Sequence, residues 1–127
     1  MLAVHWGATR VVVICGEIAV KFPRGEQGRR CNLFEAAIWE KNKGHPTRGR
    51  HLCPVLWCHP QGKVLTMPAA VPLDPDADPM AMLGTMHDDW WDYRSADDDS
   101  QPTEPKAADW GLLDGELVAV DYAAIDP

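Results

Sequence analysis

The chain has 127 residues, of which 46% are hydrophobic, with 11 prolines, 10 glycines and a formal net charge of −7. This length suits a single domain over residues 1–127 and disfavours two independent cores. No stretch reaches the roughly 18 apolar residues that a membrane helix needs. The first residues lack the basic start and apolar core of a signal peptide. We therefore expect a cytoplasmic protein that does not bind membranes.

The charge divides unevenly along the chain. Residues 1–63 contain ten Lys and Arg and four Asp and Glu, which gives a net charge of +6. Residues 64–127 contain two Lys and Arg and fifteen Asp and Glu, which gives a net charge of −13. Such segregation favours a protein whose acidic half contacts a basic partner. It disfavours direct binding of nucleic acid, because the total charge would repel the phosphates.

The first predicted element is a β-hairpin. Two β-branched runs, residues 9–15 and 18–22, are separated by a two-residue turn that contains Gly16, and Pro23 ends the second run. Residues 24–31 contain two glycines and three arginines, so we expect a loop there.

A helix is expected next, from Leu33 to Lys43. Asn32 followed three residues later by Glu35 resembles a capping box at its start, and Gly44 favours its end. The apolar residues of this helix lie on one arc, which leaves Glu35 near the edge of the buried face.

The second half predicts shorter elements. Residues 52–58 and 63–67 flank a turn and predict a second hairpin. Methionine and aromatic residues at spacings of four and three predict a short helix within 80–93, and residues 110–122 predict a third hairpin around an Asp-Gly turn. Together these elements predict an α+β fold: an antiparallel sheet of three hairpins with one main helix packed on it, and a short second helix.

Residues 74–106 form an acidic segment, rich in Asp and Pro, which we expect to be partly irregular. An exposed aromatic residue among carboxylates is a plausible anchor for a basic protein surface. The candidate partner-binding residues are Asp88, Asp89, Trp91, Asp92, Asp97, Asp98 and Asp99.

The order of the elements and several short motifs resemble the protein-kinase fold. Lys21, in the run Ile-Ala-Val-Lys-Phe, stands where the family has the strand lysine that positions the α and β phosphates of ATP. Glu35, early in the predicted helix, stands where a helix glutamate holds that lysine by an ion pair. The resemblance implies a sheet and helix like those of the kinase N-terminal lobe.

The resemblance extends to the C-terminal half and covers residues 10–123. Glu104 and Asp109 keep the spacing of the catalytic base and the metal-binding asparagine, with Glu for Asp and Asp for Asn. Asp121 begins an Asp-Tyr-Ala sequence where the family has Asp-Phe-Gly. If the protein is active, the resemblance implies ATP and Mg²⁺ as cofactors. The implied catalytic residues are then Lys21, Glu35, Glu104, Asp109 and Asp121.

Three departures argue against phosphate transfer. No Gly-x-Gly-x-x-Gly motif precedes Lys21, about thirty residues separate the second hairpin from Glu104, and six residues follow Asp121. In addition, Glu104 in place of Asp would displace the base, and a displacement of about one ångström can lower a rate by about 100-fold. We therefore expect a truncated, non-catalytic kinase-like protein, encoded by a phage, that inhibits a host nucleic-acid-binding or defence complex by covering its basic surface. A small ATP-binding phosphotransferase is the alternative.

Structural roles compete with each of these functional interpretations. Lys21 could simply extend into solvent from an edge strand, and the role of Glu35 could be limited to capping the helix. Asp109 and Asp121 could bind a divalent cation together, or they could be two solvated carboxylates. The apolar first hairpin could also pair with a second copy, so the protein is expected to be a monomer or a homodimer.

Two further groups are weaker candidates. His51, Cys53, Cys58 and His59 offer four N and S ligands, but their spacing is unlike that of familiar zinc fingers, and we expect reduced thiols without a metal. The arginines of the first half could gather at the helix start as an anion site, although a solvated basic face is the stronger interpretation. These arginines are Arg24, Arg29, Arg30, Arg48 and Arg50.

Overall fold

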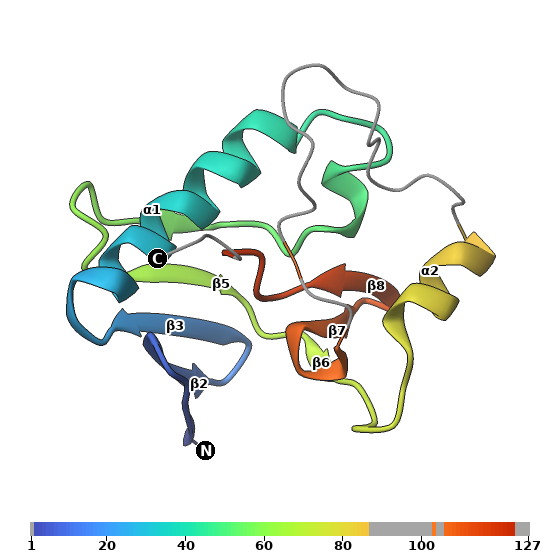
Figure 1. Cartoon of the computed structure of the whole chain (residues 1–127), viewed down its shortest axis with the longest axis horizontal. Coiled ribbons are helices and arrows are strands. Elements are labelled where there is room, and N and C mark those ends of the chain that lie inside the picture. Colours follow the sequence, from blue (N-terminus) through green and yellow to red (C-terminus); the bar gives the residue numbers. More distant parts are fainter. Residues whose placement is uncertain (1, 87–102, 104–105, 124–127) are drawn as a thin grey trace.

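The computed structural model describes residues 2–86, 103 and 106–123 of the chain (Figure 1). It confirms the predicted α+β fold, with antiparallel sheets of five and three strands, one main helix and a short second helix. The main helix lies above the five-stranded sheet (Figure 1). The three-stranded sheet lies between the five-stranded sheet and the second helix (Figure 1).

The five-stranded sheet has the order β1-β2-β3-β5-β4. Its strands are β1 (Leu2–Trp6), β2 (Arg10–Cys15), β3 (Ile18–Pro23), β4 (Trp57–Cys58) and β5 (Leu65–Pro68). The predicted first hairpin is therefore present as β2 and β3, and the preceding strand β1 extends it into a three-stranded meander. Sequence reasoning did not predict β1, because its five residues mix apolar positions with a histidine.

The predicted third hairpin forms its own sheet in the order β6-β7-β8. These strands are β6 (Val71–Pro72), β7 (Trp110–Leu113) and β8 (Glu116–Ala119). Both turn residues between β7 and β8 have positive φ angles, 52° for Asp114 and 82° for Gly115. This is the backbone that a two-residue hairpin turn requires, and an Asp-Gly pair supplies it at low cost.

The main helix α1 spans Gly25–Asn42, so the predicted start near Leu33 is wrong by two turns. Gly28 explains the early start. A Cβ added there would lie 2.2 Å from the carbonyl oxygen of Thr9 and 2.7 Å from Cα of Pro23. Glycine thus lets the first turns of α1 pass against the end of the β2–β3 hairpin, and this packing outweighs the poor helix propensity of glycine.

The correction changes the roles of two residues. Asn32 does not cap the helix but lies fully buried in its interior, and Glu35, expected near the edge of the buried face, is 0% exposed. Buried polar side chains need hydrogen-bond partners. Asn32 finds them in the sheet and in the turn at Gly62, and Glu35 finds them in the sheet and in the C-terminal segment.

The predicted second hairpin is present in shortened form as β4 and β5. Its first run begins outside the sheet: Leu52 forms a parallel bridge with Ala119, and the Cys53 amide donates to the Ala119 carbonyl at 2.9 Å. This segment leaves the five-stranded sheet because it joins β8 instead. Two short 3₁₀ helices complete the described chain, η1 (Gly49–His51) and η2 (Ala107–Asp109).

The second helix α2 spans Pro79–Met86. Asp78 caps its start, since its side-chain oxygen accepts the amides of Met80 at 3.1 Å and Ala81 at 3.2 Å. The rest of the predicted helix, residues 87–93, lies outside the described residues.

One hydrophobic core joins the two sheets and both helices. Its members come from α1, β5, α2, β7, β8 and the segments beside them, and none comes from residues 2–33. The core therefore joins the two sheets into one packed unit through β5 and not through β1–β3. Its buried members are Ile38, Leu52, Cys53, Leu65, Met67, Leu83, Trp110, Leu117, Val118, Ala119 and Tyr122.

Candidate functional site

Four charged residues from distant parts of the chain meet between the five-stranded sheet, α1 and the end of β8. Arg10 begins β2, Lys21 lies in β3, Glu35 lies in α1, and Asp121 follows β8. Alternation along β2 and β3 directs Arg10 and Lys21 toward the same side of the sheet as α1. We call these four residues the charge cluster.

The carboxylate of Glu35 is the centre of the charge cluster and accepts four hydrogen bonds. Its Oε1 atom accepts from Arg10 Nη1 at 2.7 Å and from Lys21 Nζ at 2.8 Å. Its Oε2 atom accepts from Arg10 Nη2 at 2.8 Å and from the Tyr122 amide at 3.0 Å. Two oxygens offer about four acceptor positions, so this carboxylate is saturated by the protein itself.

Lys21 and Glu35 thus form the ion pair that the kinase resemblance implies for these positions. The Lys21 side chain is 5% exposed, and its Nζ atom also donates to the carbonyl oxygen of Val120. The lysine therefore connects β3, α1 and the segment after β8 within the interior.

Arg10 adds a second cation to the same carboxylate. Its guanidinium forms a bidentate pair with Glu35, donates to Asn32 Oδ1 at 3.1 Å, and donates to Asp121 Oδ1 at 3.0 Å. The Asp121 side chain is 50% exposed, whereas the Arg10 side chain is 6% exposed. The cluster contains two cations and two carboxylates, so its formal charge is zero.

Asn32 anchors this arrangement to the second hairpin. Its amide nitrogen donates to the carbonyl of Gly62 at 2.9 Å and to the carbonyl of Lys21 at 3.3 Å. Gly62 has a φ angle of 76°, and a Cβ there would lie 2.4 Å from the Arg29 carbonyl oxygen. A glycine at this turn therefore permits the close approach of the hairpin to α1.

The electrostatics of the cluster follow from burial and pairing. Burial alone raises the pKa of Glu35, but the adjacent Lys21 and Arg10 cations outweigh that effect and lower the pKa from 4.5 to about 2. Burial likewise lowers the pKa of Arg10, but Glu35 and Asp121 outweigh it, so the pKa of the guanidinium is raised. Both groups are charged at neutral pH.

The resemblance also implies catalytic roles for Asp109 and Glu104. Asp109 is buried in η2, and its carbonyl oxygen accepts the amides of Val120 at 2.8 Å and Asp121 at 3.2 Å. The two aspartates are therefore neighbours through the backbone. Glu104 lies outside the described residues.

The surroundings of Asp121 do not fit a magnesium ion. Its Oδ1 atom already accepts from the Arg10 guanidinium and from the Ala123 amide at 3.4 Å. A guanidinium beside the carboxylate opposes a second cation by charge repulsion. Over residues 2–86, 103 and 106–123, no group of three His, Cys, Asp or Glu side chains could hold a metal ion.

The cysteine and histidine candidates serve separate structural contacts. His51 is buried with Nδ1 at 2.7 Å from the Leu117 carbonyl oxygen, and the Cys53 thiol donates to the Pro68 carbonyl at 3.4 Å. Cys58 donates to the carbonyl of its neighbour His59 at 3.4 Å. Burial raises the pKa of the Cys53 thiol to about 11, and all four cysteines are unpaired.

Three arginines of the first half have separate partners. Arg24 lies 5.5 Å above the ring of Trp6, Arg29 pairs with Glu26 at 3.0 Å, and Arg50 pairs with Glu116 at 3.2 Å. Arg48 is buried, and Arg30 is exposed.

The predicted partner-binding residues lie outside the described residues, from Asp88 to Asp99. The described part of the acidic segment contains Asp74, Asp76 and Asp78, and all three are exposed. Asp74 accepts the Asp76 amide at 2.9 Å, which fixes a local turn.

Arg10 is the member of the cluster that sequence reasoning missed. The available signal was alternation: in the hairpin register, Arg10, Val12 and Ile14 share a face with Lys21 and Ala19. A charged residue at the start of an otherwise apolar inward row predicts a buried partner. Sequence alone offered no way to choose that partner, since Glu35 and Asp121 are 25 and 111 residues away.

No family model matches the chain, and no curated protein matches it significantly. None of the helices in the described part of the chain is long and apolar enough to span a membrane. The charge cluster is therefore interpreted from its own geometry.

Proposed function

We propose that this chain is a non-catalytic, acidic interaction protein on a minimal kinase-like scaffold, which binds and inhibits a partner protein through that partner's basic surface. The observation that carries the proposal is the saturation of the Glu35 carboxylate by Arg10, Lys21 and the Tyr122 amide. A cluster with this arrangement supports the fold and leaves the binding role to the surface.

The position of Lys21 argues against nucleotide chemistry. A lysine that binds the phosphates of ATP must reach them with a free donor direction. Here the amine is buried, and two of its three N–H donors are bound to Glu35 and to the Val120 carbonyl. Arg10 bridges Glu35 and Asp121 on the adjacent side, so a triphosphate would have to separate buried, charge-assisted hydrogen bonds before it could bind.

The charge distribution supports a basic partner. The second half of the chain has a net charge of −13, and the described acidic residues at its start, Asp74, Asp76 and Asp78, are exposed. A dense row of carboxylates attracts cationic grooves such as those that hold nucleic acid, and such attraction accelerates association. A host nucleic-acid-binding or defence complex is the class of partner that this chemistry selects.

The test is capture of partners from a bacterial lysate with the full chain as bait. We expect a retained protein to be released between about 50 mM and about 500 mM salt, because exposed charges are screened. Added double-stranded DNA should also release it, since DNA competes for the same basic groove. Retention that is equal at both salt concentrations contradicts the proposal.

A matched pair of variants locates the contact. Changing Asp97, Asp98 and Asp99 to Asn removes three charges from the acidic segment and should weaken capture. Changing Glu17, Glu26 and Glu40 to Gln removes three charges from the basic half and should leave capture unchanged. Equal losses for both variants would indicate a response to total charge alone.

The alternative is a small ATP-binding phosphotransferase, and the Lys21–Glu35 pair is the observation that favours it. Thermal unfolding with millimolar ATP and Mg²⁺ separates the two functions, because a ligand at 100 times its dissociation constant stabilises a protein by about 2.7 kcal/mol. We expect no shift in the unfolding temperature. A shift accompanied by transfer of labelled phosphate would establish the alternative.

A further inference from the structure

The outer face of the five-stranded sheet is apolar across its whole width. The strand register aligns one residue from each strand in a single row: Val4, Val13, Val20, Thr66 and Trp57. On either side of it the register aligns two shorter rows: Trp6, Val11 and Phe22, and Leu2, Cys15, Ile18 and Pro68. None of these residues is charged, and together we call them the apolar face. The nearest cation in contact with it is Arg24, whose guanidinium lies 5.5 Å from the ring of Trp6 at one edge of the face.

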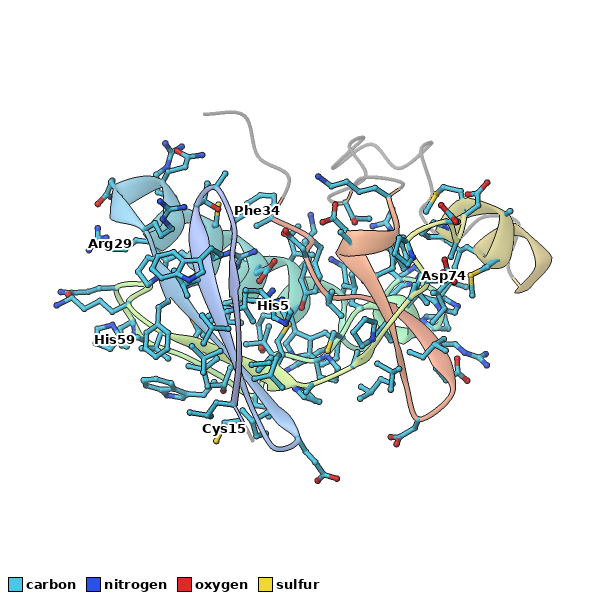
Figure 2. All side chains as sticks on the ribbon, turned by 90° about the horizontal axis from the view of Figure 1, so that it is seen from below. His5, Cys15, Arg29, Phe34, His59 and Asp74 are labelled. Atoms are coloured by element: carbon cyan, nitrogen blue, oxygen red, sulfur yellow. The ribbon has the colours of Figure 1, made fainter. Side chains whose placement is uncertain are left out.

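Helix α1 covers the opposite side of this sheet. Along β3, Ala19 and Lys21 are buried toward α1, whereas Ile18 and Phe22 on the apolar face are 36% and 42% exposed. The view in Figure 2 is from below, and the ribbons of β1 and β2 pass in front of α1. Among residues 2–86, 103 and 106–123, no helix or strand is packed over the apolar face.

The exposed area is large for a monomer. Trp6 is 73% exposed, Leu2 65%, Trp57 53% and Val4 50%. A large aromatic side chain has a surface of up to about 250 Å². From their exposed fractions, Trp6, Trp57 and Phe22 alone present about 400 Å² of surface to solvent. Soluble monomers rarely expose a continuous apolar patch larger than a few hundred Å².

We propose that the apolar face is the interface of a homodimer, in which two copies stack their sheets face to face about a two-fold axis. The absence of charge favours a second copy as the occupant. In a two-fold interface the same patch of both copies comes into contact. A patch with charges of one sign therefore repels its counterpart, whereas an uncharged apolar patch is self-complementary.

The area is sufficient for such a dimer. The aromatic side chains of two copies supply about 800 Å², and the aliphatic side chains of the three rows raise the buried area toward the roughly 1,200–2,000 Å² of stable interfaces. Two antiparallel sheets stack about 10 Å apart with their strands inclined by about 30°. The valines of the central row would then interdigitate with those of the second copy.

Sedimentation equilibrium of the full chain between about 1 and 200 µM tests the proposal, and we expect a dimer at the upper end. Val4→Lys places a cation in the central row of both copies, so the dimer dissociation constant should rise at least about 100-fold. His5→Lys is the matched control. It adds the same side chain to the next position of the same strand, which faces the other side of the sheet, and should leave the dissociation constant unchanged.

Circular dichroism shows whether each variant is folded, and Ile18→Lys in β3 is a second variant of the apolar face if Val4→Lys does not fold. A wild-type protein that is monomeric at every concentration overturns the proposal. A dimer that persists in both Val4→Lys and Ile18→Lys overturns it as well. The exposed aromatics could instead stack on bases. A monomer that binds a fluorescent single-stranded oligonucleotide, with the binding lost in Trp57→Ala, would assign the face to nucleic acid and refute the dimer.

Discussion

Replacing Arg10 with methionine tests whether the charge cluster stabilises the fold. The substitution keeps a long apolar stem but removes the bidentate pair with Glu35, whose carboxylate is 0% exposed. Removing one partner of a buried ion pair typically costs about 3–5 kcal/mol, because the remaining charge stays buried with fewer donors. We expect Arg10→Met to lower the free energy of unfolding by that amount, which is a large part of the about 5–15 kcal/mol of a typical domain.

Asp121→Asn provides the comparison within the same cluster. Asp121 also pairs with Arg10, but its side chain is 50% exposed, so solvent screens the interaction and its loss should cost less than about 1 kcal/mol. Urea unfolding followed by tryptophan fluorescence measures both variants, since Trp110 is buried in the core. If Arg10→Met loses no more stability than Asp121→Asn, the cluster does not stabilise the fold as its geometry indicates.

The pH dependence of stability gives an independent measurement. The pKa of Glu35 is lowered from 4.5 to about 2 by Lys21 and Arg10, despite burial. A carboxylate whose pKa is lower in the folded state than in the unfolded state stabilises the fold at every pH above the unfolded-state pKa. Here that stabilisation is about 3 kcal/mol, and it is lost as the pH falls from about 4.5 toward 2. Without the Arg10 cation the pKa of Glu35 shifts less, so the stability difference between wild type and Arg10→Met should narrow in this range. A difference that is constant or widens would contradict this assignment.

Two further predictions concern the packing of α1 and of the core. Gly28→Ala should destabilise the protein by at least about 1 kcal/mol in the same urea assay, because the added Cβ would lie 2.2 Å from the Thr9 carbonyl oxygen. Gly44→Ala should not destabilise the protein in this way, because a Cβ added there would have no other atom within 4 Å. With a thiol reagent at pH 8 and about 1 µM protein, where the proposed dimer is dissociated, exposed Cys15 should react within minutes. Cys53, whose burial raises its pKa to about 11, should react only when urea unfolds the chain. Fast labelling of Cys53 in the native protein, or equal stability losses for the two glycine variants, would show that the corresponding packing is absent.

Local patterns predicted much of the secondary structure correctly. The β2–β3 hairpin follows from two β-branched runs around Gly16, whose φ angle is 61°, and the β7–β8 hairpin follows from the Asp-Gly pair at its turn. These predictions hold because a hairpin turn and its neighbouring strands are specified within a few residues. The start of α1 was mispredicted for the opposite reason: Gly28 weakens a helix locally, and only contacts with Thr9 and Pro23 explain its presence there.

The candidate site was predictable only in part. The kinase resemblance placed Lys21 opposite Glu35, and the structure brings the two within 2.8 Å. It gave no indication that Arg10 would reach the same carboxylate or that Asn32 would be an interior residue of α1. Their partners lie on other elements, and the pairing emerges only when the sheet, the helix and the C-terminal segment are packed together.

The sequence by itself determined the α+β class, the hairpins and the separation of basic and acidic halves, because these depend on local propensity and on composition. Alternation along β2 and β3 also defined an apolar row and a mixed row. Only the tertiary structure decided which row α1 covers: the polar groups of Arg10 and Lys21 can be buried only where Glu35 neutralises them. The helix therefore packs on the charged row, and the fully apolar row is left on the surface.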